Sequence, residues 1–298
     1  PGPVRPRPGH ADRSGCYHWL DRYIRSTLER SSPRETAARV AAGAVCRQLL
    51  AVAGTEVLGF VRRVHTAALA DALPAAEFEP AELTGLRTVR DGSRLYTLDP
   101  AADAAMLACV QAAAQDRDTV GGTVEVVAAG VVPGLGTCVQ WHERLEARLA
   151  AALHSIPAIK GVEIGAGFAV AERRGSEVHD TVLPERSGLG GAVHRRGSNR
   201  AGGIEGGMTN GQPLVVRAAM KPISTLRQPL ASVDLETGAV AEAGYERSDV
   251  CAVSACALVA EAMVAIVLAD ATLERIGGES MAEFGARLAT FLASVRQI

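Results

Sequence analysis

The sequence predicts a single α+β domain in which antiparallel sheets cover helices. Its predicted strands and helices are mixed without the regular βα alternation of a doubly wound sheet. A long, nearly all-apolar helix is predicted at 251–276, and such a helix in a soluble chain is buried on most sides. Aromatic residues make up only 4% of the chain beside 31 glycines, so the core must be Val, Leu, Ile and Ala with closely packed backbones. Without a repeat or a linker after residue 12, we expect one domain over residues 1–298.

Local patterns predict the elements in chain order. Residues 1–9 hold four prolines and are not expected to form regular structure. The run from Ser32 to Glu35 has the form of a capping box with proline at the first helical position, which predicts a helix to about Leu50. The other expected elements are a weak helix in 13–29, strands at 57–64, 123–129, 214–220 and 232–235, a strand–turn–strand at 160–168, helices at 101–115 and 143–154, loops with one short helix in 66–100, and a polar, glycine-rich stretch at 182–200.

Charge and cysteine content exclude several classes of protein. The net charge is −2, which gives no support to a nucleic-acid or membrane partner, whereas the arginine clusters at 5–13 and 195–200 suit a small anion. The six cysteines form no C-x-x-C pair and the histidines show no metal-ligand spacing, so we expect reduced thiols and no metal. No apolar run reaches the roughly 20 residues that span a bilayer, and no signal peptide is visible, so a cytoplasmic protein is expected.

The stretch 196–225 carries two glycine pairs, an Asn-Gly turn, the predicted strand 214–220 and then Lys221, Pro222, Ile223, Ser224 and Thr225. Glycine pairs let backbone N–H groups approach an anion, and a lysine with hydroxyls adds donors for phosphate. A tight turn between two strands explains the same glycines equally well. The segment alone does not decide between these two interpretations.

Three further candidates each have a plainer structural explanation. His10, in a loop flanked by arginines, is either a general acid or an ordinary surface histidine. Arg30, Ser31 and Ser32 precede the helix and either bind an anion or supply the cap through Ser32. Arg247 has the chemistry of an anion clamp, and Asp249 is either a base or the N-cap of the long helix.

Together, these stretches resemble the chorismate synthase family, in its actinobacterial form. The resemblance covers nearly the whole chain and is carried by RPGHAD at 7–12, RSSPRETAARVAAGAV at 30–45, SIPAIKGVEIGAGF at 155–168, RGSEVHD at 174–180, SNRAGGIEGGMTNGQPLVVRAAMKPIST at 198–225, VDLETG at 233–238 and ERSDVCAV at 246–253. It implies a β-α-β sandwich with helices between antiparallel sheets, assembled as a homotetramer. It also implies a lyase of the shikimate pathway that converts 5-enolpyruvylshikimate 3-phosphate to chorismate by 1,4-anti elimination, using reduced FMN (FMNH2), with NADPH for flavin reduction.

The resemblance also assigns roles to residues. His10 matches an active-site histidine, and Asp249 matches the aspartate that helps to deprotonate the substrate through the flavin. The residues that match flavin contacts are Arg30, Ser31, Ser32, Pro157, Ala158, Gly206, Lys221, Pro222, Ile223, Ser224, Thr225 and Arg247.

The sequence departs from the family pattern at three places. A segment holding GESHG, with the first histidine and several substrate arginines, is not found, so an N-terminally shortened chain with little or no activity on its own is expected. Pro33 replaces alanine, and residues 13–25 do not match the usual run. A flavin- or anion-binding remnant without catalysis and a purely structural fragment are the alternative functions.

Overall fold

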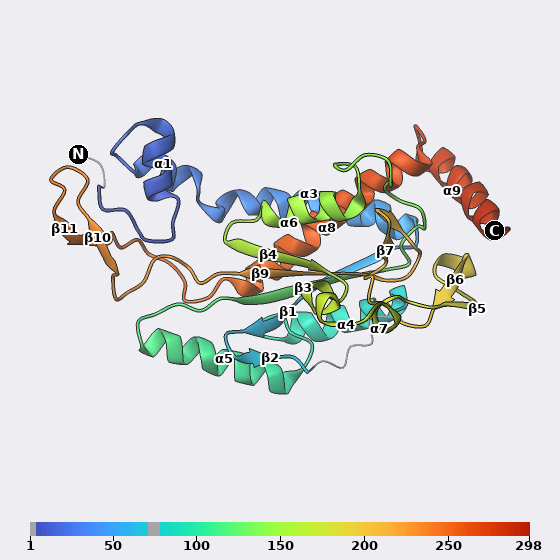
Figure 1. Cartoon of the computed structure of the whole chain (residues 1–298), viewed down its shortest axis with the longest axis horizontal. Helices are drawn as coiled ribbons and strands as arrows, with labels where there is room; N and C mark the ends of the chain where they lie inside the picture. Colours follow the sequence, from blue (N-terminus) through green and yellow to red (C-terminus); the bar gives the residue numbers. More distant parts are fainter. Residues whose placement is uncertain (1–3, 71–77) are drawn as a thin grey trace.

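The fold is built on one five-stranded antiparallel sheet with strand order β2-β1-β3-β9-β4, which confirms the α+β class. The computed structural model describes residues 4–70 and 78–298 (Figure 1). The strands of the sheet are β1 (Glu56–Val64), β2 (Ala67–Ala68), β3 (Gly122–Ala129), β4 (Ile159–Ile164) and β9 (Leu214–Met220). Four of these five had been predicted to within two residues, because buried strands form short apolar runs between turn signals.

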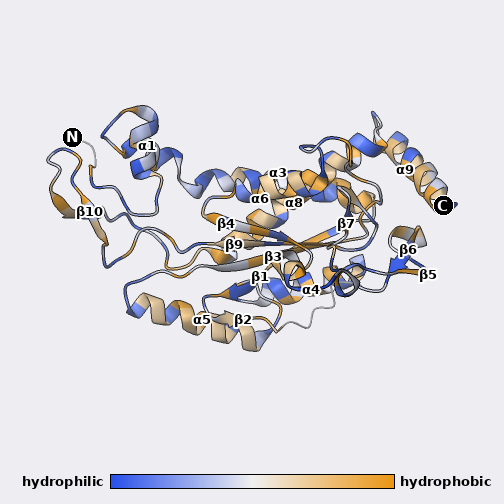
Figure 2. Cartoon of the chain, viewed as in Figure 1, coloured by the Kyte–Doolittle hydropathy of each residue, from blue (hydrophilic) through white to orange (hydrophobic). Residues whose placement is uncertain are grey.

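Helices lie on both faces of this sheet in the described part of the chain (Figure 1). One face is covered by α3 (Thr36–Val52), α6 (Leu145–His154) and α8 (Val253–Ile276), and the other by α4 (Pro80–Gly92) and α5 (Pro100–Gln115). Figure 2 shows that the sheet and the helices against it are mainly apolar. The expectation that no apolar run is long enough to span a bilayer is wrong for α8, whose length and hydropathy alone would let it cross a membrane. However, 67% of its apolar window is buried inside the fold, as expected of a core helix.

Close backbone packing replaces large side chains between α8 and its neighbours. A Cβ added to Gly43 of α3 would lie 2.5 Å from the Cβ of Ala262, and one added to Gly59 of β1 would lie 2.5 Å from the carbonyl oxygen of Ala257. Both partners belong to α8, so glycine is needed where α3 and β1 approach it. The predicted core of small aliphatic residues is confirmed.

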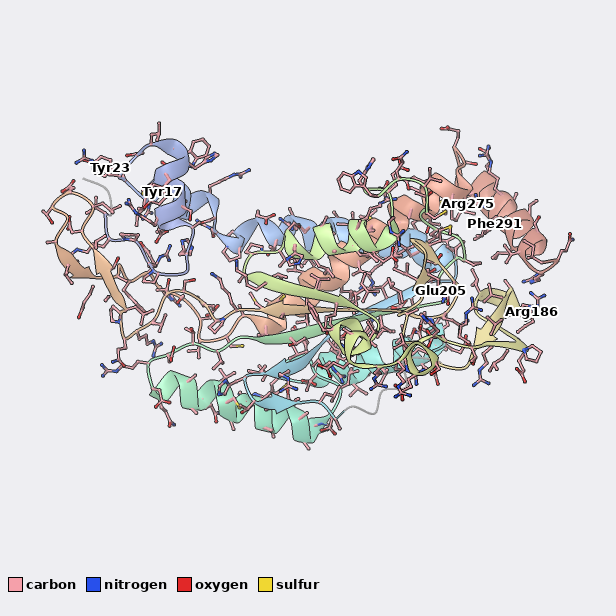
Figure 3. The ribbon with its side chains drawn as sticks, viewed as in Figure 1. Tyr17, Tyr23, Arg186, Glu205, Arg275 and Phe291 are labelled. Carbon is pink, nitrogen blue, oxygen red and sulfur yellow. The ribbon has the colours of Figure 1, made fainter. Side chains whose placement is uncertain are left out.

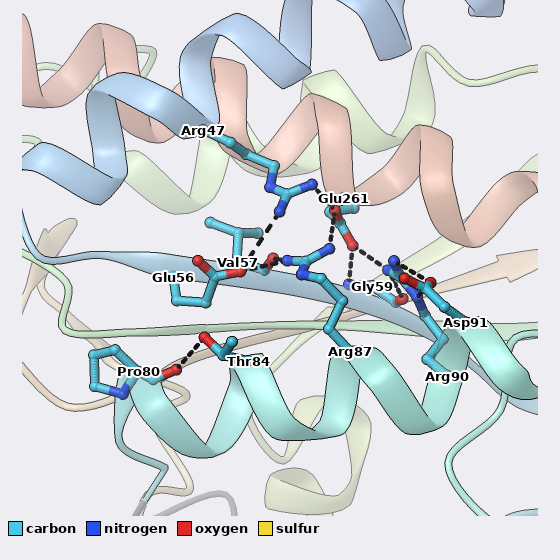
Figure 4. Close-up of polar contacts among 10 residues, drawn as sticks. All are labelled: Arg47, Glu56, Val57, Gly59, Pro80, Thr84, Arg87, Arg90, Asp91 and Glu261. Atoms are coloured by element: carbon cyan, nitrogen blue, oxygen red, sulfur yellow. Dashed lines mark hydrogen bonds and ion pairs between the residues drawn. The ribbon is translucent and has the colours of Figure 1, made fainter.

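Arginine side chains bind the backbone of β1 along the side where β2 pairs only with Arg63 and Val64. Arg90 Nη1 donates to the Gly59 carbonyl at 2.9 Å, and Arg87 donates to the Val57 carbonyl. The Gly59 N–H donates to Glu261 Oε2 on α8 at 2.7 Å (Figure 4). An edge strand offers unpaired backbone groups, and here side chains from α4 and α8 satisfy them.

The remaining elements lie around this core, and some were not predicted. The stretch 182–200 contains a two-stranded sheet where only polar, glycine-rich chain was expected, and β4 is followed by a 3₁₀ helix rather than a second strand. A helix after residue 276 was not predicted, and the loop expected around Pro74 lies outside the described residues.

The elements outside the central sheet and its five covering helices are α1 (Asp12–Trp19), α2 (Arg25–Arg30), η1 (Pro33–Glu35), η2 (Gly167–Glu172), α7 (Gly175–Val178), η3 (Leu189–Gly191), α9 (Met281–Val295), β5 (Val182–Ser187), β6 (Val193–Arg196), β7 (Ile204–Glu205), β8 (Met208–Thr209), β10 (Ala231–Val233) and β11 (Val240–Glu242).

Candidate active site

The site forms at the end of the sheet where β9 finishes and β4 begins. Ile159 pairs with Met220, and the Lys221 N–H donates to the Ala158 carbonyl at 3.0 Å. The predicted pair Pro157 and Ala158 therefore lies against the start of the segment 221–225. Ala158 has a φ of 71°, a left-handed conformation that is uncommon for a residue with a side chain and that clusters at functional sites.

The loop that carries His10 docks on the same segment. The Lys221 ammonium donates to the Gly9 carbonyl, and Arg7 Nη1 donates to the Thr225 hydroxyl at 2.8 Å. Thr225 is 4% exposed, so this contact anchors the loop in the fold rather than on its surface. His10 is thereby held one residue from the contact between Gly9 and Lys221.

Arg247 and Asp249 reach this place from a third part of the chain. The Ser248 hydroxyl donates to the Thr225 carbonyl at 3.2 Å, and the Val120 N–H donates to the Val250 carbonyl at 3.0 Å. The N-cap interpretation of Asp249 is wrong, because α8 begins at Val253 and its N-cap is Ala252. The exposed Asp249 carboxylate is therefore not used by the helix.

Arg30, Ser31 and Ser32 lie at the junction of α2 and η1. Arg25 of α2 forms an ion pair with Glu246 at 3.8 Å, which ties this junction to the segment that holds Arg247. Ser32 is the N-cap of η1, which begins at Pro33 as predicted and leads directly into α3. The predicted capping box is not formed, because the Ser32 side chain makes no cap hydrogen bond. The Ser32 hydroxyl accepts instead from Arg34 Nε at 2.9 Å.

Gly206 is not brought to this site within one chain. It lies in the turn between β7 and β8, beyond the Leu214 end of β9, whereas Lys221 follows the Met220 end. Figure 3 places its neighbour Glu205 at the other end of the molecule from Tyr17 and Tyr23 of the N-terminal region.

The two glycine pairs of this stretch serve different purposes. All four glycines have a positive φ, and added Cβ atoms at Gly202, Gly203 and Gly207 would overlap backbone atoms of other segments. These three confirm the tight-turn interpretation. An added Cβ at Gly206 would meet nothing nearer than Met208 Cε at 4.0 Å, so only this glycine faces open space.

The cations at the site fit an anionic ligand. Arg30, Lys221 and Arg247 form no ion pair with any residue that the structure describes. Burial, and secondarily the nearby charge of Lys160, lower the pKa of Lys221. A phosphate group beside Lys221 would favour the charged ammonium and so offset both effects. Sequence reasoning had found Arg30, Lys221 and Arg247 but not Lys160.

Two residues of the site were missed by sequence reasoning. Arg7 and Asp12 flank His10 and bind each other and its ring, as described below. The available signal was the His-Ala-Asp spacing, which places a carboxylate two residues after the histidine.

Known proteins share this sequence and fold. Residues 3–273 match the family described as chorismate synthase. The chorismate synthase of Nocardia farcinica is 52% identical over 282 residues, covering 94% of this chain and 66% of the relative. That of Saccharopolyspora erythraea is 50% identical over 296 residues, covering 99% of this chain and 71% of the relative. A solved structure titled as a crystal structure of chorismate synthase superimposes with a TM-score of 0.81 at 38% identity, covering 97% of this chain and 77% of that one.

The chain thus spans about two thirds of the length of the first of these relatives. The match runs through every segment that meets at the end of β9. The chain belongs to the chorismate synthase family, whose members are lyases of aromatic amino acid biosynthesis.

Proposed function

We propose that this chain carries out the chorismate synthase reaction, the 1,4-anti elimination of phosphate from 5-enolpyruvylshikimate 3-phosphate, with reduced FMN as cofactor. One observation carries the proposal. Segments around His10, Ala158, Lys221 and Ser248 are far apart in the sequence but are joined by hydrogen bonds at one end of the sheet. The family resemblance assigns flavin or catalytic roles to these same segments.

The residues at the site divide into binding and proton-handling groups. Lys221, Arg247 and Arg30 bind the anionic groups of the cofactor, with hydroxyl donors from Ser31, Ser32, Ser224 and Thr225. When bound by these residues, reduced FMN would supply electron density to the allylic system as phosphate leaves. Stabilisation of the departing phosphate is the role that the family resemblance gives to the arginines of the GESHG segment. Asp249 would be the proton acceptor beside a bound flavin, and His10 would face the substrate.

The position of Gly206 is explained if the functional unit contains several copies of the chain. We propose a cytoplasmic homotetramer in which the open turn at Gly206 contacts a flavin held by a neighbouring subunit, and NADPH serves as reductant. Light scattering in solution measures the number of chains directly.

Replacement of Asp249 by alanine is expected to lower kcat by about 10²–10⁴-fold, because one proton transfer loses its acceptor. The measurement is anaerobic chorismate formation by the complete product of the gene, supplied with reduced FMN and 5-enolpyruvylshikimate 3-phosphate. Asp270→Ala is the control, since Asp270 is an exposed carboxylate paired with Arg148 on α6.

Binding and turnover together separate the proposed reaction from its alternatives. Loss of kcat in Asp249→Ala with unchanged flavin affinity supports the assigned role, and equal kcat in both variants contradicts it. Flavin binding by a complete product that forms no chorismate would identify a non-catalytic binding protein. Residues 1–298 alone are assayed in parallel, and turnover there would refute the expectation that they have little activity on their own.

A further inference from the structure

The Asp12 carboxylate lies in an arrangement that no role assigned so far explains. It is 0% exposed, yet it is surrounded by donors from Arg7 and His10. Asp12 Oδ2 accepts from the Arg7 backbone N–H at 3.0 Å and from Arg7 Nε at 2.9 Å. Asp12 Oδ1 accepts from Arg7 Nη2 at 3.1 Å and lies 2.5 Å from His10 Nδ1. Each oxygen therefore has two neighbouring donor nitrogens.

These contacts keep Asp12 ionised. Burial raises the pKa of the Asp12 carboxyl, but hydrogen bonds from His10 and then from Arg7 outweigh it and bring the pKa well below its usual range. An ionised carboxylate only accepts hydrogen bonds. The nitrogen 2.5 Å from Asp12 Oδ1 must therefore carry a proton, which makes His10 Nδ1 the donor.

We propose that Asp12 is a positioning residue for His10: it holds the imidazole as the Nδ1–H tautomer, so that Nε2 carries no proton and is the acceptor nitrogen of the ring. The assignment of His10 to the reaction rests on the proposed function, whereas the tautomer does not. An orienting carboxylate of this kind fixes both the ring plane and the site of the exchangeable proton.

Arg7 connects the His10 ring to the segment 221–225. Its guanidinium lies 3.1 Å from His10 Nδ1 and 3.3 Å from His10 Nε2, and it also reaches the buried Thr225 hydroxyl. The charged groups that face the ring are thus Arg7 and Asp12, with Lys221 one residue away at the Gly9 carbonyl. Arg7 ties the oriented histidine to the segment 221–225, so the two parts of the site are set relative to each other.

The geometry predicts the effect of an amide at position 12. Arg7 presents two donors to Oδ2, so the oxygen of Asp12→Asn takes that position and the amide nitrogen takes the place of Oδ1. An amide N–H then faces His10 Nδ1, which must become the acceptor. The ring is expected to switch to the Nε2–H tautomer, the change that such replacements produce in orienting carboxylates.

The test is ¹⁵N NMR of histidine-labelled residues 1–298 at a pH where the imidazoles are neutral. The His10 signals are assigned by their loss in His10→Gln. We expect a protonated Nδ1 in the unsubstituted chain and a protonated Nε2 in Asp12→Asn, and no change in Asp21→Asn, whose carboxylate accepts from the nearby Tyr23 N–H. A thermal melt shows whether each variant is folded.

Several outcomes decide the inference. A protonated Nε2 in the unsubstituted chain overturns it even if Asp12→Asn fails to fold, and so does an unchanged tautomer in a folded Asp12→Asn. In the complete gene product we expect Asp12→Asn to lower kcat by at least about 10-fold with little change in KM. A product that forms no chorismate while the tautomer switches as expected would reject the proposed function and leave the positioning role intact.

Discussion

Replacement of Glu261 by alanine is expected to lower the free energy of unfolding by about 3–5 kcal/mol, because it leaves buried positive charge unpaired. Glu261 lies on α8, is 4% exposed, and accepts from Arg90 Nη1 at 2.5 Å and from Arg87 Nη1 at 3.0 Å. Arg47 of α3 lies 2.9 Å from the same carboxylate (Figure 4). One side chain thus joins α3, α4, α8 and β1, whose Gly59 N–H also loses its acceptor.

A matched control lies between three and four turns further along the same helix. Glu274 is exposed and accepts from Arg148 Nη1 at 2.6 Å, so Glu274→Ala is expected to cost no more than about 1 kcal/mol. Urea unfolding followed by circular dichroism measures both values. Similar costs for the two replacements would show that the buried cluster contributes no more than a surface pair.

Replacement of Gly43 by valine is expected to destabilise the fold by about 3 kcal/mol through overpacking. The first added carbon would lie 2.5 Å from Ala262 Cβ and 2.6 Å from Ala262 Cα, and the backbone of α8 cannot rotate away as a long side chain would. The two helices would have to separate, which exposes core that is filled by small residues.

The control for Gly43 is a helical glycine with free space around it. Gly85 of α4 is exposed and an added Cβ would meet nothing within 4 Å, so Gly85→Ala is expected to stabilise the protein by about 0.5–1 kcal/mol. Thermal and urea unfolding give the sign of each change. A Gly43→Val protein as stable as the unsubstituted chain would contradict the close contact between α3 and α8.

Sequence patterns predicted the elements of the core better than their ends. The strand 214–220 was predicted to the residue, because its apolar run is bounded by an Asn-Gly turn and by Lys-Pro. Ser32 was correctly placed at a helix start but makes no capping hydrogen bond, and Asp249 is not the N-cap of α8, because a polar residue before a helix also serves loops and tertiary contacts. The sheet order was not predictable, since β1, β3, β9 and β4 pair across long sequence separations.

For the candidate site, too, the sequence predicted the residues but not the contacts between them. The family resemblance named its residues, but it did not show that Ala158 and Lys221 share a hydrogen bond or that Gly206 lies at the far end of the sheet. The contacts among Arg7, His10 and Asp12 depend on burial of the Asp12 carboxylate, which no periodic pattern in a proline-rich loop reveals.

The central claim is that the end of β9 forms a flavin site, and anaerobic titration of reduced FMN into residues 1–298 tests it most directly. Fluorescence is followed for the unsubstituted chain, for Lys221→Ala and for the distant control Arg296→Ala. We predict saturable binding that Lys221→Ala weakens by about 10-fold or more, as expected for loss of a charge-assisted hydrogen bond, and that Arg296→Ala leaves unchanged. Absence of saturable binding by the unsubstituted chain, or equal affinity in all three proteins, would contradict the claim.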